Sequence, residues 1–149
     1  MTTDDPQASP DRLNLIVFSG TYERVHYALV LASGAQASER PATLFFTMGA
    51  ARALVADAGD GRPGWHALPT EDGRPAAVLD ARFAQRGVAG FEDLLAGCLS
   101  LGVTTMVCEM GLQALNIAPE SLRGDIPLKA GGVITFLNDA SRHGGMMFL

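Results

Sequence analysis

The segment Val103–Ile117 limits most strongly what this chain of 149 residues can fold into. It starts with a β-branched and apolar run that ends in Cys108, and a short amphipathic stretch with Leu112 and Leu115 three residues apart follows at once. Such a run, followed directly by helical spacing, predicts a strand, a tight turn and a helix. Cys108 is therefore expected at the carboxyl end of a strand.

The same succession of strand and helix occurs in the first third of the chain. Leu13–Phe18 predicts a buried strand, and a helix is expected over about residues 22–37. Ala42–Phe46 predicts a second strand, and residues 50–56 a second helix. One face of the first helix is small and apolar, with Val25, Ala28, Leu29 and Ala32. This alternation predicts an α/β domain with a mostly parallel sheet covered by helices.

The middle of the chain is less regular, and we expect an excursion from the domain at about residues 57–90. Up to residue 75 it is rich in Gly, Pro, Asp and Arg around Trp65, and residues 76–87 have weak helical character. A loop this long is unusual in a compact domain, so it is either a flap over the site or a surface ordered by a neighbouring subunit. Phe91–Leu101 then predicts a helix that ends at Gly102.

After the Cys108 segment, the pattern predicts four further elements and places the whole of residues 13–149 in one domain. They are a helical turn at Pro119–Leu122, a short strand at Ile126–Leu128, a helix from Gly131 to about Ala140, and a last strand at Met146–Leu149. Residues 1–12 hold acidic and small polar residues and two prolines, and are expected to be a disordered tail. They lack the basic and apolar regions of a signal peptide.

Charge and composition exclude several classes of function. The net charge of −5 gives no electrostatic basis for binding nucleic acid or an anionic membrane surface. Apolar runs are shorter than the roughly 20 residues that a membrane helix needs. The two cysteines, Cys98 and Cys108, fall in different expected elements and do not form a disulfide framework, which favours a reducing compartment, the cytoplasm.

Cys108 is the candidate catalytic residue. Ligands of open α/β sheets bind at the carboxyl edge, and the free amides at a helix start favour an anion such as a thiolate. An accessible thiolate there would be more reactive than an ordinary one. The alternative is that Cys108 is a small buried hydrophobic residue. Cys98 lies on the apolar face of its helix and is predicted to be a core residue, and the alternative is that it is a catalytic partner of Cys108.

Two further groups border the expected site. Ser19-Gly20-Thr21 forms a turn before the first helix that either holds a phosphate, sulfur oxyanion or persulfide, or is a plain N-cap turn. Met48, Met106 and Met110 either line an apolar pocket for sulfur or fill the core. Cys108 with Ser19, Gly20, Thr21, Met48 and Met110 makes up the candidate site.

No metal site and no cofactor are expected. His26, His66 and His143 lie far apart and share no metal-ligand spacing with the cysteines. No Gly-x-Gly-x-x-Gly or phosphate-loop lysine motif follows the first strand, so nucleotide binding has no support in the sequence.

Three blocks in order resemble the DsrE/DsrF-like sulfur-relay family, in particular its peroxiredoxin-like DsrE branch. They are Phe18-Ser19-Gly20 with its helix and the following strand, Leu101 through Cys108 to Ile117, and Ala130–Leu137 with the terminal strand. The chain differs from that branch at Thr21, where an acidic residue is common, and at Met48-Gly49, where an aromatic residue is common.

The resemblance implies a three-layer α/β/α domain with a five-stranded sheet, assembled into trimers or hexamers. It also implies that Cys108 carries sulfane sulfur as a persulfide between sulfur donor and acceptor proteins or small thiols. The alternative is a non-catalytic oligomeric binding or scaffold protein of the same fold, with Cys108 buried and the segment around Trp65 contacting a partner. A thiol peroxidase is the third hypothesis, and it lacks an accessible resolving cysteine and the Pro-x-x-x-Thr-x-x-Cys pattern.

Overall fold

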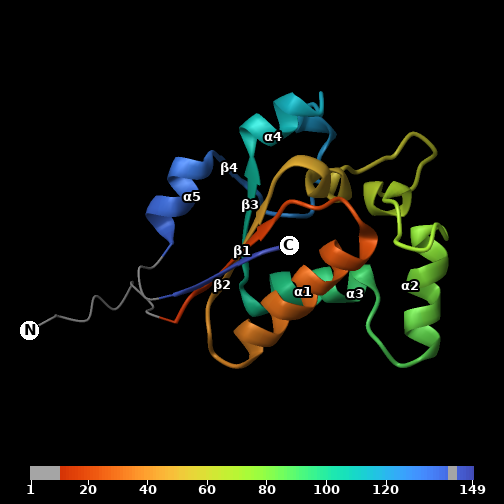
Figure 1. Ribbon diagram of the computed structural model, residues 1–149, viewed down its shortest axis with the longest axis horizontal. Helices are drawn as coiled ribbons and strands as arrows, with labels where there is room; N and C mark the ends of the chain where they lie inside the picture. The colour runs from red at the N-terminus through yellow and green to blue at the C-terminus, as the bar shows by residue number, and fades with distance from the viewer. Residues whose placement is uncertain (1–10, 141–143) are drawn as a thin grey trace, which may run out of the picture.

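The computed structural model describes residues 11–140 and 144–149, and its centre is a five-stranded parallel sheet (Figure 1). The strands are β1 (Leu13–Val17), β2 (Ala42–Phe46), β3 (Thr104–Cys108), β4 (Lys129–Gly131) and β5 (Gly145–Phe148). Their order across the sheet is β4-β3-β2-β1-β5, and every neighbouring pair is parallel. The α/β fold class is thus confirmed. Most of the expected tail lies outside the described residues.

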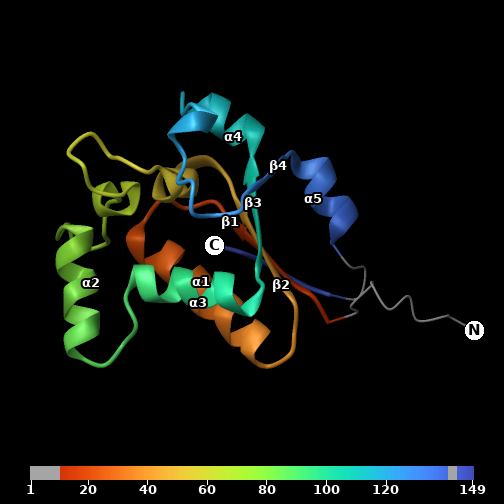
Figure 2. The same cartoon turned by 180° about the vertical axis from the view of Figure 1, so that it is seen from behind.

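Helices lie on both sides of this sheet. α1 (Tyr22–Ala37) and α3 (Phe91–Leu101) lie side by side on one face, and α5 (Val133–Asp139) lies on the other (Figures 1 and 2). The remaining elements are η1 (Met48–Leu54), η2 (Gly64–Ala67), α2 (Ala76–Gln85), α4 (Glu109–Ala114) and η3 (Pro119–Ser121). No helix in the described part of the chain is long and apolar enough to cross a membrane.

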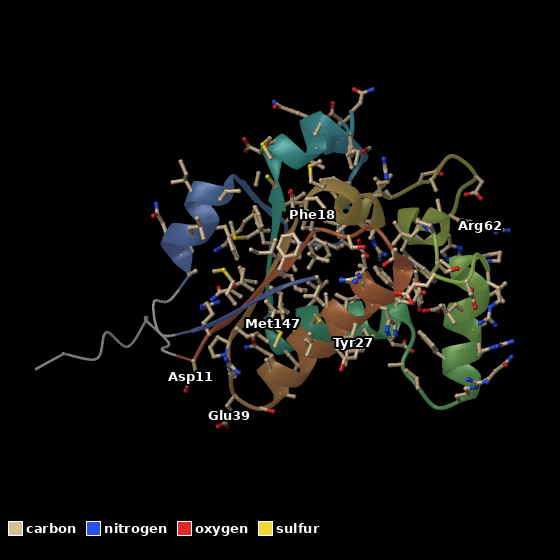
Figure 3. The ribbon with its side chains drawn as sticks, viewed as in Figure 1. Asp11, Phe18, Tyr27, Glu39, Arg62 and Met147 are labelled. Carbon is tan, nitrogen blue, oxygen red and sulfur yellow. The ribbon has the colours of Figure 1, made fainter. Side chains whose placement is uncertain are left out.

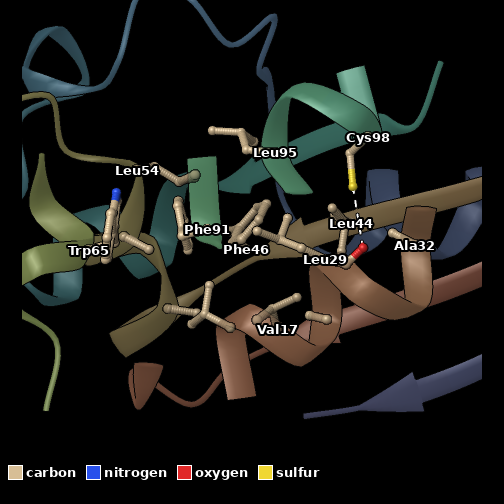
Figure 4. Packing of buried hydrophobic residues seen from close by; sticks show 14 of the residues in the cluster. Val17, Leu29, Ala32, Leu44, Phe46, Leu54, Trp65, Phe91, Leu95 and Cys98 are labelled. Atoms are coloured by element: carbon tan, nitrogen blue, oxygen red, sulfur yellow. Dashed lines mark hydrogen bonds between the residues drawn. The ribbon is translucent and has the colours of Figure 1, made fainter. Parts of the chain in front are cut away.

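The main core lies between the sheet and the α1–α3 layer. Alternate side chains of β1 and β2, such as Val17, Leu44 and Phe46, point toward these helices because successive residues of a strand face opposite sides. They pack against Leu29 of α1 and Leu95 of α3 (Figure 4). Gly102 ends α3 in the left-handed conformation, at a φ of +89°, as the sequence predicted.

A smaller cluster occupies the other face. Phe45, Met106 and Cys108 point to this side and are covered by Phe136 of α5. The Phe136 ring stacks on Phe45 with 4.6 Å between centroids and 14° between planes. The helix layer on this face is therefore one short helix.

The segment around Trp65 packs against its own chain. Trp65 is buried, stacks on Phe91 at 4.9 Å and donates its indole N–H to Glu92 at 2.7 Å. The Tyr22 hydroxyl donates to Asp80 of α2 and so ties that helix to α1. These few contacts hold the segment in place. The residues that form them are not regularly spaced in the sequence, so the sequence pattern did not reveal them. Trp65 itself is buried, so its side chain is not part of an exposed surface.

Two expected elements lie elsewhere. The strand expected at Ile126–Leu128 is β4 at Lys129–Gly131, because Ile126 is buried in the main core. The chain pairs with β3 only after Leu128, where it forms an exposed edge strand. The helix expected over residues 50–56 is the 3₁₀ helix η1, which begins two residues earlier, at Met48.

Candidate functional site

The carboxyl edge of the sheet brings most of the predicted site residues together. The Ser19-Gly20-Thr21 turn follows β1, Met48 follows β2 and α4 follows β3. A Cβ on Gly20 would lie 2.8 Å from the Gly49 carbonyl oxygen, and one on Gly111 would lie 2.7 Å from the Met48 backbone nitrogen. These glycines allow the three loops to touch at their backbones.

Cys108 is the last residue of β3 and the N-cap residue of α4. This is the strand end that the sequence predicted. Its side chain makes no capping hydrogen bond and is 0% exposed, packed in the cluster under α5. The thiol is therefore at the expected edge but is covered by its own chain.

Some polar groups of the Ser19-Gly20-Thr21 turn form hydrogen bonds within the chain. Ser19 Oγ accepts the Thr21 backbone N–H at 3.3 Å, and Thr21 is the N-cap of α1 without a side-chain capping bond. The first helical N–H, of Tyr22, donates to the Pro69 carbonyl at 2.9 Å. The excursion thus occupies one of the amides that an anion would need.

The three methionines have different environments. Met106 is buried beside Cys108, and Met110 is 60% exposed on α4. Met48 has a positive φ of +49°, an uncommon conformation for a residue with a side chain. Such conformations are often found at functional sites. Met48 is half-buried and Met110 exposed, whereas Met106 lies in the interior.

Cys98 and His26 lie away from Cys108. Cys98 belongs to the main core on the opposite face, where its thiol donates to the Leu29 carbonyl with 3.4 Å between sulfur and oxygen (Figure 4). Burial raises the pKa of this thiol to about 11. The sheet separates the two cysteines. His26 is buried between α1 and α2, with Nε2 2.9 Å from the Ala89 carbonyl oxygen and its ring beside Phe83.

A cavity of about 630 Å³ lies beside β3 and α4, and the sequence did not predict it. Its walls are mostly apolar, with Val107, Leu112 and Ile126, and Glu109 is among its polar residues. Val107 and Cys108 point to opposite faces of β3, so Cys108 does not line this space. Apolar residues of this kind are expected in any core, and no sequence feature distinguished them.

Among the described residues, no group of three His, Cys, Asp or Glu side chains is placed to hold a metal ion. His143 lies outside the described residues.

The sequence matches no protein-family model and no curated protein. The structure is similar to the crystal structure of the YchN protein from E. coli, with a TM-score of 0.60 and 14% sequence identity. The similarity covers 93% of this chain and 99% of YchN. YchN has a DsrE/DsrF-like fold, and this chain has the same fold.

Proposed function

We propose that the protein is a sulfurtransferase or sulfur-carrier protein that holds sulfane sulfur as a persulfide on Cys108. The observation that carries the proposal is the position of Cys108, at the end of β3, beside the edge where the β1 and β2 loops meet. The DsrE/DsrF-like fold and the three sequence blocks around this cysteine support the same function.

The proposed reaction is a thiol exchange that requires one cysteine. The Cys108 thiolate attacks the outer sulfur of a donor persulfide, R–S–SH, and the S–S bond of the donor breaks. The donor leaves as the thiolate R–S⁻, and Cys108 becomes Cys–S–SH. An acceptor thiolate then takes the outer sulfur in the same way and restores the Cys108 thiolate, so no outside oxidant or reductant is needed.

The residues around this edge are proposed to form the substrate surface. Ser19, Gly20 and Thr21 offer a hydroxyl-lined turn for an anionic sulfur group, and Met48 and Met110 offer apolar, polarizable contacts. We propose that the donors and acceptors are cytoplasmic proteins or small thiols, without metal or cofactor. Nucleic acid is not a proposed partner.

We also propose that the protein is a homo-oligomer, a trimer or a hexamer. Several large apolar side chains are exposed on the α5 face, including Ile134 at 77% and Phe148 at 66%. Phe18, labelled in Figure 3, follows β1 at the carboxyl edge. Its ring lies 5.4 Å from the ring of Phe148. Exposed large apolar side chains on one face favour contact with another chain. Ile134→Glu is expected to lower the mass measured by light scattering, and Asn138→Ala on the same helix is not.

The direct test is mass spectrometry with peptide mapping after incubation with a persulfide donor. We expect a gain of one or more sulfur atoms on Cys108, lost in Cys108→Ser and kept in Cys98→Ala. Both variants remove a buried thiol, so Cys98→Ala controls for the loss of a core cysteine. An unmodified Cys108 in the folded wild-type protein would refute the proposal.

A binding or scaffold protein of the same fold is the second candidate. The complete burial of Cys108 favours it, because a buried thiol can be a purely structural residue. In that case the exposed apolar side chains on the α5 face would contact the partner. An inert Cys108 together with oligomers that Ile134→Glu disrupts would support this candidate.

A further inference from the structure

α5 is the element that covers Cys108. The thiol shares its cluster with Phe45, Met106 and Phe136, and Phe136 is the member of this cluster that α5 contributes. Access of any sulfur donor to Cys108 therefore depends on the position of this helix.

The attachment of α5 to the sheet is narrow. Of its seven residues, Phe136 alone is buried, and its ring stacks on Phe45. The neighbouring apolar residues Val133, Ile134 and Leu137 are 48%, 77% and 50% exposed, so none of them is buried as Phe136 is. An element with so few buried apolar contacts opens at a lower free energy than the rest of a domain.

The chain before α5 suits a hinge. Gly131 ends β4 and Gly132 is the N-cap of α5. A Cβ on Gly132 would meet no atom within 4 Å, so the backbone there is not enclosed by neighbours. Two successive glycines give this junction wide conformational freedom.

Cys98 provides an internal comparison. It is 0% exposed, like Cys108, but it lies between α1 and α3 in the main core. Exposing Cys98 requires the separation of these two long helices. Cys108 lies in a small cluster to which α5 contributes only Phe136, so displacement of one short helix opens this cluster.

We propose that α5 is a gate over Cys108, which turns about Gly131-Gly132 and exposes the thiol while the main core stays folded. Where a second chain contacts the α5 face, the gate opens once that contact is released. The functional meaning of this gate rests on the proposed sulfur chemistry, since a persulfide donor must reach the thiol. In the closed position the same helix shields a Cys108 persulfide from solvent.

The test is alkylation of the native protein with excess iodoacetamide at several low urea concentrations, with each cysteine followed by peptide mapping. We expect Cys108 to react on the order of 100-fold faster than Cys98. Its rate should depend little on urea, because local opening exposes little surface, whereas the Cys98 rate should rise steeply. Equal rates with the same steep dependence on urea would overturn the gate.

A pair of variants on α5 tests the role of the ring. Phe136→Ala should raise the Cys108 rate by about 10-fold. Because the lost contact also lowers the free energy of unfolding, the Cys98 rate should rise by no more than the same factor and keep its steep dependence on urea. Asn138→Ala, at an exposed position of the same helix, should change neither rate. An unchanged Cys108 rate in Phe136→Ala would overturn the proposal, because the ring would then not be the contact that holds the helix over the thiol.

Alkylation and sulfur loading separate the two proposals. Fast, urea-independent alkylation of Cys108 without persulfide loading would refute the sulfur function and keep the gate. Persulfide loading of a Cys108 that is alkylated only on global unfolding would keep the function and refute the gate.

Discussion

On one face of the sheet, α1 and α3 lie side by side over a large apolar core, whereas on the other face α5 covers a small cluster through Phe136. Each face holds one fully buried cysteine. The difference shows that equal burial does not mean equal protection, because the cost of exposing a side chain depends on what must move.

Polar contacts strengthen the first face further. Arg123 donates two hydrogen bonds of 2.7 Å to the Glu92 carboxylate at the start of α3, and Trp65 donates a third to the same group. The backbone N–H of Arg123 donates to the Leu54 carbonyl. This clamp joins α3, η1, η2 and the segment after η3 around the carboxyl end of the main core.

The largest expected effect is a difference between two phenylalanines of similar burial. Phe46→Ala in the main core should lower the free energy of unfolding by about 3–5 kcal/mol, because a cavity remains between fixed elements. Phe136→Ala should cost only about 1–2 kcal/mol, because undocking of α5 sets a ceiling on the loss. Urea unfolding followed by far-ultraviolet circular dichroism measures both values. An equal loss of unfolding free energy in the two variants would show that α5 is as firmly packed on the sheet as α1 and α3.

Much of this architecture follows from local patterns in the sequence. The apolar runs at Leu13–Val17 and Ala42–Phe46 correspond to β1 and β2, and α1 and α3 begin and end where periodicity and Gly102 predict. These elements are long or strongly apolar, so tertiary contacts reinforce what their sequences already favour.

The site could be predicted only in part. β3 is almost fully buried on both faces, so its sequence has no alternation that shows to which side Cys108 points. The cover comes from Phe136, in an element remote in sequence, and its stacking on Phe45 has no local signature. β4 is a three-residue strand with exposed side chains, and its pairing with β3 rather than its composition defines it.

The clamp gives an intermediate effect that sharpens the comparison. Arg123→Met should lower the free energy of unfolding by about 1–2 kcal/mol, since it removes charge-assisted hydrogen bonds that are only partly buried. Fluorescence of Trp65, the one tryptophan of the chain, reports the loss during urea unfolding. The Cys108 alkylation rate should stay unchanged because the clamp lies on the other face. A faster Cys108 reaction in this variant would show that the two faces are coupled.

The clamp also predicts acid sensitivity. The hydrogen bonds from Arg123 hold the pKa of Glu92 below its ordinary value of 4.5. The folded protein thus binds fewer protons at this carboxylate than the unfolded chain, so its stabilisation is present above pH 4.5 and is lost as the pH falls through the lowered pKa. When the pH is lowered from 7 to about 4, the free energy of unfolding should fall less in Arg123→Met than in the wild type. An identical loss in both proteins would contradict this assignment.

The smallest expected effect concerns the buried thiol of the main core. Cys98 has a pKa raised by burial from 9.0 to about 11, so the folded protein keeps a proton that the unfolded chain releases. This contribution is fully present below pH 9 and declines as the pH rises toward 11. Between pH 8 and 10 the decline is about 1 kcal/mol.

Cys98→Ala lacks this titration, so the stability difference between wild type and variant should change by that amount over this range. Because both proteins share every other titrating group, including Tyr22, whose pKa is also raised by burial, the comparison isolates the thiol. A stability difference that stays constant over this pH range would mean that water reaches Cys98 in the folded state. The environments of the two cysteines would then be similar, although α1 and α3 cover one and α5 the other.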